Sequence, residues 1–284
     1  MPDLHSLAGK TLFITGGSRG IGLAIARRAA RDGANVVIAA KTVDPHPKLQ
    51  GTIHTAAALI EQAGGHALPL PLDVRDAQAI EEAVATAAAH FGGIDICVNN
   101  ASAINLSGSE DIDVRRFDLI QQINVRGTFL VSRACIPHLR KSANPHVLML
   151  SPPLTIRADW FGPHLPYSLS KYGMSMVALG MAEEFRAQGI AVNALWPRTT
   201  VATAAVEHVI GGEQMMQRSR RPEIMADAAY AIFLRDARAF SGQFVLDEDV
   251  LRQAGVTDFA PYRYDPAADL QIDMFVESDG NAIS

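Results

Sequence analysis

Short apolar runs alternate along this 284-residue chain with longer segments of helical periodicity. The short runs predict strands at residues 11–15, 35–40, 67–72, 94–98, 146–150, 190–196 and 242–246. The longer segments predict helices near residues 21–32, 53–63, 76–91, 113–141, 165–188 and 222–235, with Gly33, Gly64 and Gly92 ending three of them. Such alternation is typical of a parallel sheet with helices on both faces. We therefore expect an α/β protein of three layers.

Pro69 and Pro71 fall inside the third predicted strand. Proline has no N–H to give to a neighbouring strand, so this strand should lie at an edge of the sheet. The third strand occupies an edge in a Rossmann-type doubly wound sheet, in which the strand order begins 3-2-1. The sequence therefore predicts a Rossmann-type doubly wound parallel sheet of seven strands, and we take residues 1–284 as a single domain.

Composition restricts the possible partners. The net charge is −5, and the lysines and arginines are scattered, which argues against nucleic acid as a partner. No apolar run approaches the roughly 18 to 20 residues of a membrane span, and the first residues lack the apolar core of a secretory signal. The two cysteines have no metal-ligand spacing. We expect a soluble cytoplasmic protein with no membrane partner and no metal site.

The first predicted strand runs directly into the sequence TGGSRGIG, which opens the next helix. Glycines allow the backbone to approach a pyrophosphate closely, and the free amides of a helix N-terminus attract its charge. An ordinary glycine-rich turn is the alternative, but strand, glycines and helix follow in the order that dinucleotide binding requires. The residues that we assign to this site are Gly16, Ser18, Arg19, Gly20, Ile21 and Gly22.

The end of the second predicted strand bears on the choice of cofactor. An NAD-binding fold places an acid there for the ribose hydroxyls, but this chain has Ala40, Lys41 and Thr42. Lys41 and Arg19 could neutralise a 2′-phosphate, so we expect NADP(H) to be preferred and NAD(H) to be possible. As alternatives, both cations are merely solvated, or Asp44 folds back as the acid.

Tyr167 and Lys171 are four residues apart in the helical segment 165–188. This spacing puts both side chains on one face of a helix, where an ammonium group can lower the pKa of a phenol. The pair is therefore a candidate proton donor together with the group that tunes it. Tyrosine and lysine at this spacing also occur by chance, so the pair indicates a function only together with other motifs.

Several motifs supply that context. TGGSRGIG, LDV at 72–74, NNAS at 99–102, QINVRG at 122–127 and YSLSK at 167–171 together resemble the motifs of short-chain dehydrogenases/reductases. The resemblance implies an NAD(P)-dependent oxidoreductase that interconverts a carbonyl and an alcohol. It also implies a homodimer or homotetramer.

The resemblance implies roles for individual residues. Tyr167 would donate or accept the proton, while Lys171 would lower its pKa and bind the nicotinamide ribose. Asn124 would hold a water that links the lysine to solvent, or else make a structural bond inside its helix. Asp73, with Val74 beside it, would accept from the adenine amine, or else cap the next helix. A further residue, Asn100, would lie along the adenosine.

Two departures from the family pattern concern catalysis. The family has a pair of serines after the fifth strand, whereas this chain has Ser151 followed by Pro152. Ser151 is our candidate for the hydrogen bond to the substrate oxygen, and its alternative is a serine that simply ends the strand. Pro197 is followed by Arg198, where the family has glycine.

Large apolar residues near the expected mouth of the pocket indicate a small apolar carbonyl or alcohol as substrate. They are Trp160, Phe161, Leu165, Met174, Met215 and Met216, and they could instead pack the core or an interface. We expect a substrate lid near residues 199–222 and a C-terminal extension over 251–284. The alternative function is a catalytically impaired NADP(H)-binding sensor or scaffold of the same fold.

Overall fold

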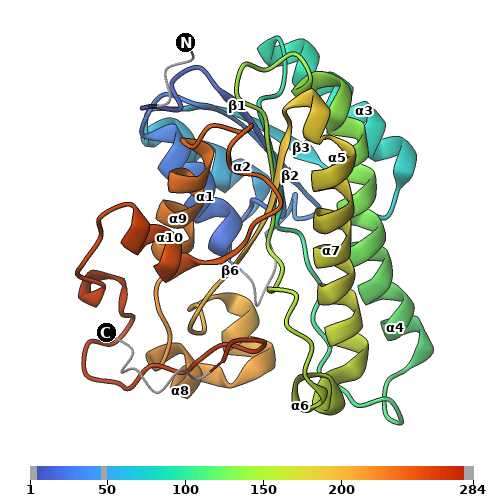
Figure 1. Ribbon diagram of the computed structural model, residues 1–284, viewed down its shortest axis with the longest axis vertical. Coiled ribbons are helices and arrows are strands. Elements are labelled where there is room, and N and C mark those ends of the chain that lie inside the picture. The colour runs from blue at the N-terminus through green and yellow to red at the C-terminus, as the bar shows by residue number, and fades with distance from the viewer. Residues whose placement is uncertain (1–4, 46–49, 278–284) are drawn as a thin grey trace.

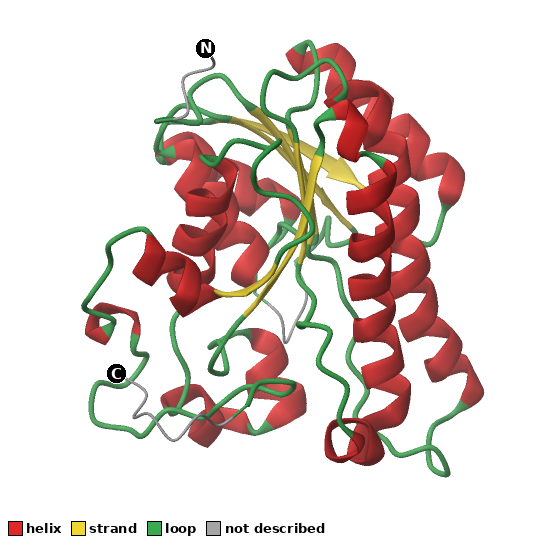
Figure 2. Cartoon of the chain, in the orientation of Figure 1, coloured by secondary structure: helices red, strands yellow, loops and turns green. Residues whose placement is uncertain are grey.

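The computed structural model describes residues 5–45 and 50–277 and contains a seven-stranded sheet at its centre (Figures 1 and 2). The strand order is β3-β2-β1-β4-β5-β6-β7, and every neighbouring pair is parallel. The strands are β1 (Thr11–Thr15), β2 (Asn35–Ala40), β3 (His66–Pro71), β4 (Ile96–Asn99), β5 (His146–Met149), β6 (Ala191–Trp196) and β7 (Phe244–Leu246). The Rossmann-type sheet is thereby confirmed, with the proline-containing β3 at an edge.

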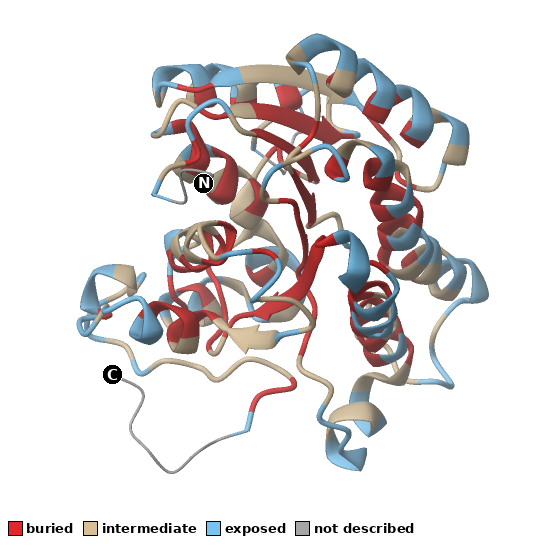
Figure 3. Ribbon diagram, turned by 45° about the horizontal axis from the view of Figure 1, so that its top comes forward, coloured by how far each residue is buried: buried red, intermediate tan, exposed pale blue. Residues whose placement is uncertain are grey.

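Helices cover both faces of the sheet, which gives the three layers that the sequence predicts (Figure 1). On one face α1 (Gly20–Ala30), α2 (Ile53–Gln62), α9 (Glu223–Phe233) and α10 (Asp247–Gln253) pack onto the strands. On the other face lie α3 (Ala77–Phe91), α5 (Thr128–Leu139) and α7 (Leu165–Glu184). The central strands β1, β4, β5 and β6 are buried along their whole length, as Figure 3 shows. Apolar packing on both faces therefore fixes the strand ends that carry the site.

The segment expected as one helix over 113–141 is interrupted. It consists of α4 (Val114–Ile120), a π-helical turn over Gln121–Gly127, and α5. Asn124 lies in that turn and is fully buried, and its side chain bonds to groups outside its own helix. A π-helical turn widens a helix locally and is frequent at functional sites. Helical periodicity alone does not reveal such a turn, because the apolar pattern continues through it.

Two segments that the sequence analysis left without secondary structure contain short helices. Residues 199–222 include a π-helical turn over Val206–Ile210 and the helix α8 (Gly212–Gln217), and a further short helix, α6 (Ala158–Phe161), precedes α7. The chain beyond α10 returns to the lid segment through backbone bridges between Thr199 and Ile272 and between Arg220 and Arg263. The C-terminal stretch therefore lies against the segment 199–222.

Candidate active site

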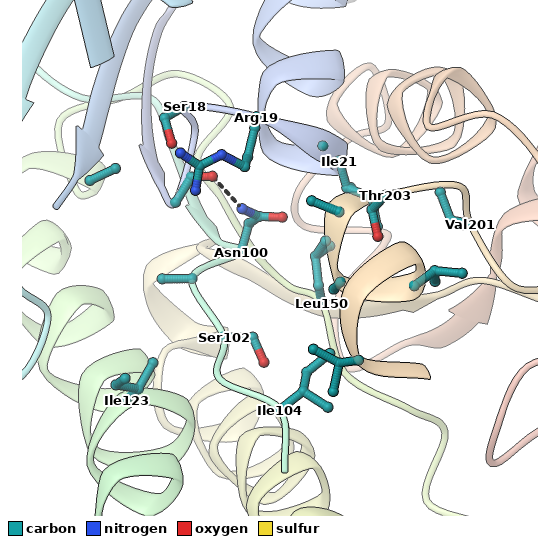
Figure 4. Close-up of a pocket in the computed structure, with 18 of the residues that line it drawn as sticks. Ser18, Arg19, Ile21, Asn100, Ser102, Ile104, Ile123, Leu150, Val201 and Thr203 are labelled. Atoms are coloured by element: carbon teal, nitrogen blue, oxygen red, sulfur yellow. Dashed lines mark hydrogen bonds between the residues drawn. The ribbon is translucent and has the colours of Figure 1, made fainter. Parts of the chain in front are cut away.

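A cavity of 690 Å³ lies at the carboxyl ends of the strands. Residues at the end of each strand from β1 to β6, or directly after it, line this cavity, and open α/β sheets bind their ligands at this edge. Figure 4 shows part of the lining, with Ser18, Arg19 and Ile21 on one side and Ser102 and Ile104 on the other. The cavity thus joins the glycine-rich turn to the region around α7.

The glycine-rich turn is shaped so that only glycine fits. Gly16 and Gly20 have φ angles of 66° and 56°, in the left-handed region that other residues rarely adopt. The side-chain amide of Asn100 donates to the carbonyls of Thr15 and Gly16 at 2.9 and 3.0 Å. A Cβ on Gly22 would lie only 2.5 Å from that amide nitrogen, so this glycine makes room for Asn100.

Most of the residues predicted to bind the cofactor line the cavity. The ones that do are Gly16, Ser18, Arg19, Gly20, Ile21, Lys41, Asp73, Val74, Asn100, Tyr167 and Lys171. The eleven-residue helix α1 begins at Gly20, so its N-terminus faces the same space. Positive-φ glycines, absent Cβ atoms and a helix N-terminus form a cradle that fits the pyrophosphate of a dinucleotide.

The two cations proposed for a 2′-phosphate are already in contact with protein groups. Lys41 Nζ lies 3.1 Å from a carboxylate oxygen of Asp73, and its side chain is 60% exposed. Arg19 donates to the backbone carbonyls of Gln50 and Gly51 at 2.9 and 2.7 Å. Both side chains therefore line the cavity. A bound phosphate would compete with the contacts that each cation already makes.

Asp73 does not cap the helix that follows it. The cap of α3 is Asp76, whose carboxylate accepts from the N–H groups of Gln78 and Ala79. Asp73 instead accepts from Arg75 and Lys41, and chiefly the Arg75 hydrogen bond holds the pKa of its carboxyl well below the usual range. Asp73 is thus an ionised acceptor at the cavity wall.

Tyr167 and Lys171 both face the cavity from α7 and are almost fully buried. Lys171 Nζ donates to the carbonyl of Leu150 at 2.6 Å and lies 3.4 Å from the sulfur of Met174. Burial lowers the pKa of Lys171 to about 7, and burial followed by the charge of Asp273 raises the pKa of the Tyr167 phenol. The direction for Tyr167 is opposite to the one expected from Lys171, because burial and the charge of Asp273 both disfavour the ionised phenol.

Asn124 is held by three hydrogen bonds. Its side chain accepts from the N–H of Ala103 at 2.8 Å and donates to the Ala103 carbonyl at 3.0 Å and to Ser170 Oγ at 2.8 Å. These bonds tie the π-helical turn to the loop after β4 and to α7, which carries Tyr167 and Lys171. Its predicted part in a water chain stays a prediction.

Ser151 is the second residue after β5 and is buried, and its hydroxyl has no hydrogen-bond partner among the described residues. Leu150 is among the described residues that line the cavity, whereas Ser151 is not. Pro152 follows, and its carbonyl accepts a bond from the Ser175 hydroxyl at 2.6 Å. The geometry therefore gives the catalytic assignment of Ser151 no support, and that assignment stays a prediction.

Four of the six large apolar residues named above belong to two small clusters. Trp160 and Phe161 pack with Tyr167, Tyr172 and Trp196, whereas Met215 and Met216 pack under the turn that contains Val206. The apolar part of the cavity wall includes Ile104, Trp196, Val206, Ile210 and Met274. The space next to Tyr167 is therefore predominantly apolar, although different residues from those expected line it.

Sequence reasoning missed Asp273 as a residue of this cavity. Asp273 reaches it from the C-terminal stretch, more than a hundred residues after Tyr167. No motif or spacing in the sequence marks Asp273, because its position depends on the bridges that bring the C-terminal stretch back to residues 198–200. In residues 5–45 and 50–277 no three His, Cys, Asp or Glu side chains are grouped as metal ligands would be.

The fold and the cradle define a dinucleotide-binding α/β protein with a buried tyrosine and lysine at the end of its binding cavity. A family model described as short chain dehydrogenase matches residues 10–212. The chain belongs to the short-chain dehydrogenase family, and it is an oxidoreductase by that membership.

Relatives of known name and structure agree with this assignment. Hydroxysteroid dehydrogenase-like protein 2 of Danio rerio is 59% identical over 98% of this chain and 66% of its own length, and the Homo sapiens protein is 53% identical over 100% and 67%. The chain therefore spans about two thirds of the length of these relatives. A short chain dehydrogenase from Mycobacterium thermoresistibile is 56% identical, with a TM-score of 0.91 over 96% of this chain and 97% of that one. A crystal structure from Xanthomonas campestris is 55% identical, with a TM-score of 0.93 over 96% and 100%.

Proposed function

We propose that this protein is an NADP(H)-dependent oxidoreductase that interconverts a small apolar carbonyl compound and its alcohol. The observation that carries the proposal is that Tyr167 and Lys171 face the same cavity as the glycine-rich turn. The family uses NAD or NADP, and the cofactor when bound supplies or accepts the hydride. The apolar wall beside Tyr167 supports an apolar substrate.

In carbonyl reduction, Tyr167 would donate its phenolic proton to the substrate oxygen. Burial raises the pKa of this phenol, so the proton is present at neutral pH, as a proton donor requires. Lys171 would place a positive charge beside the phenol and help it to lose the proton when the oxygen becomes basic. The apolar wall and the segment 199–222, our proposed lid, would exclude water from this transfer.

Replacing Tyr167 by phenylalanine tests the proposed mechanism. We expect Tyr167→Phe to lower kcat for a panel of apolar aldehydes and ketones by about 10²- to 10⁴-fold, the usual contribution of a general acid. NADPH binding, measured by calorimetry, should change little. The matched control is Tyr172→Phe in the same helix. The Tyr172 hydroxyl donates to the carbonyl of Thr155, and we assign it no part in the proton transfer. Unchanged turnover by Tyr167→Phe would show the mechanism to be wrong.

Lys41 tests the preference for NADP(H). We expect Lys41→Ala to raise the Kd for NADPH about tenfold and to leave the Kd for NADH nearly unchanged, since one charge-assisted contact to a phosphate is lost. The exposed pair of Lys41 with Asp73 contributes little to folding, so the variant should be stable. Lys10→Ala is a matched control. Lys10 precedes β1 and so lies at the opposite edge of the parallel sheet from Lys41, and it pairs with Asp95 at 3.6 Å. An equal loss for both cofactors would contradict the assignment of Lys41.

A second candidate function is a sensor or scaffold that binds NADP(H) without turnover. The observation in its favour is the position of Ser151, buried and outside the described lining of the cavity. Tight NADPH binding with no oxidation of NADPH across a broad panel of carbonyl compounds would favour it. Turnover of any panel member would favour the reductase.

A further inference from the structure

The C-terminal stretch around Asp273 is fixed by bonds to residues of β6 and the loop after it. The N–H of Asp273 donates to the Arg198 carbonyl at 3.0 Å, and the N–H of Thr200 donates to the Gln271 carbonyl at 2.9 Å. On the other side of Asp273, the Trp196 indole donates to the carbonyl of Met274 at 2.8 Å. The backbone on both sides of the Asp273 side chain is thereby held in place.

Phe275 anchors the same stretch. Its ring is 3% exposed and lies against Trp160, Tyr167, Tyr172 and Trp196, at centroid distances of 5.4 to 6.5 Å. Figure 3 shows the stretch passing from half-buried to buried just before the described chain ends. Phe275 has a φ of 66°, the one positive φ among the described residues other than glycine. Such a conformation persists only where the surroundings enforce it, so the position of Asp273 is well determined.

The carboxyl of Asp273 is coupled electrostatically to the proposed catalytic pair. Its negative charge raises the pKa of both Tyr167 and Lys171. Burial, and after it the nearby charge of Asp247, raises the pKa of Asp273 itself to about 7, whereas hydrogen bonds from the Met274 N–H and the Trp196 side chain and the charge of Lys171 act in the opposite direction. The raised pKa favours the neutral form of Asp273, and a neutral carboxyl can donate a hydrogen bond.

The serine that would be the expected hydrogen-bond donor at the substrate oxygen is not among the described residues that line this cavity. Short-chain dehydrogenases use a serine hydroxyl at the substrate oxygen, but here the serine after β5 is buried and lies outside the described lining. Asp273 lines the cavity together with Tyr167 and Lys171. A hydrogen-bond donor at a reacting oxygen typically contributes about 10²- to 10³-fold to kcat.

We propose that Asp273 in its neutral form donates a hydrogen bond to the substrate oxygen beside Tyr167, in place of the family's serine. The proposal rests on the reductase function proposed above. No bond to Asp273 is made or broken, since the hydride comes from the cofactor and the proton from Tyr167. The carboxyl only stabilises the negative charge that develops on the oxygen during reduction.

The test compares an amide, which keeps a neutral donor, with side chains that have none. At pH 7 we expect Asp273→Asn to retain kcat for carbonyl reduction within about threefold, and Asp273→Leu to lose about 100-fold. Asp273→Ala serves as a second donor-free variant if the leucine disturbs the aromatic cluster. The matched control is Asp269→Asn, an exposed acid of the same stretch, which should behave as wild type. NADPH binding by calorimetry and thermal unfolding of each variant show that the site is intact.

The outcomes separate this proposal from the proposed function. Equal losses in Asp273→Asn and Asp273→Leu would overturn the donor role, because they would show that the carboxylate itself is needed. Full activity in Asp273→Leu or Asp273→Ala would overturn it as well. In both cases wild-type turnover, and its dependence on Tyr167, would leave the reductase standing. A wild-type protein that binds NADPH but reduces no carbonyl compound would overturn both.

Discussion

Burial controls the charge of several titratable side chains in this molecule. Lys171 and Asp273 each have a pKa of about 7, the former lowered and the latter raised by desolvation. His146 in β5 follows the same rule, since burial lowers its pKa to about 4. Its Nε2 lies 3.1 Å from the carbonyl of Arg235 and from Asn144 Nδ2. His146 is therefore neutral in the folded protein over the whole physiological range.

The lowered pKa of His146 predicts how stability depends on pH. Below its unfolded pKa of about 6.5 the unfolded chain binds a proton that the folded protein refuses until about pH 4, so the free energy of unfolding falls with falling pH. Asp247 and Asp273, whose raised pKa values act in the opposite sense, contribute equally to wild type and His146→Gln. Hence the stability of wild type relative to His146→Gln should decrease by about 2.5 kcal/mol between pH 7 and pH 4.5. Urea unfolding of both proteins measures this, and a difference that stays constant with pH would contradict it.

Among the elements, α10 connects the lid segment to the body of the protein through ion pairs. Glu248 at its start pairs with the fully buried Arg220 of the lid segment and with Arg252 at 3.3 Å. The carboxylate of its neighbour Asp247 accepts from the N–H of Arg198 at 2.9 Å. The acids Asp247 and Glu248 thus hold the loop after β6 and the end of the segment 199–222.

Removing Glu248 should be strongly destabilising. Glu248→Leu takes the carboxylate away from a guanidinium that stays buried, and we expect the free energy of unfolding to fall by about 3–5 kcal/mol. The double variant Arg220→Met with Glu248→Leu should recover most of that loss, because an apolar pair of similar volume needs no charge compensation. Urea unfolding of the wild type and the variants measures both effects. A double variant no more stable than Glu248→Leu would show that the ion pair is not the source of the loss.

Some of the elements could be predicted from sequence patterns, and others could not. Strands and long helices follow from local periodicity, so β1 to β7, α1, α2, α3, α7 and α9 were predictable, as was the edge position of β3. The π-helical turn around Asn124 was not, because the side-chain bonds at its centre run to Ala103 and Ser170. Tyr167 and Lys171 share a face by spacing alone, whereas Asp273 joins them only through contacts between distant segments.

At the scale of the whole molecule, one helical surface carries an unusual number of exposed apolar side chains. On α7, Leu169, Met176 and Leu179 are 45%, 52% and 48% exposed, and Phe129 at the start of the neighbouring α5 is 43% exposed. Positions 169 and 176 are about two helical turns apart, and 179 is one turn further, so the three form a stripe. Within the described residues, no helix is both long enough and apolar enough to span a bilayer. Because exposed apolar side chains that lie together mark interaction surfaces, we propose the stripe as the surface for association into a homodimer or homotetramer.

Charges placed on this stripe should separate the subunits. We expect wild type to elute as a dimer or tetramer in size-exclusion chromatography with light scattering, and the double variant Met176→Asp with Leu179→Asp to elute as a monomer, because two buried carboxylates without partners oppose association. Ile156→Asp is the matched control, since Ile156 is an exposed apolar residue (69%) on the loop after β5. The proposed catalytic pair, Tyr167 and Lys171, projects from the same helix α7, so the monomer should also show a lower thermal unfolding temperature and weaker NADPH binding. A wild-type monomer at micromolar concentration, or a double variant of unchanged mass, would rule out this surface as the interface.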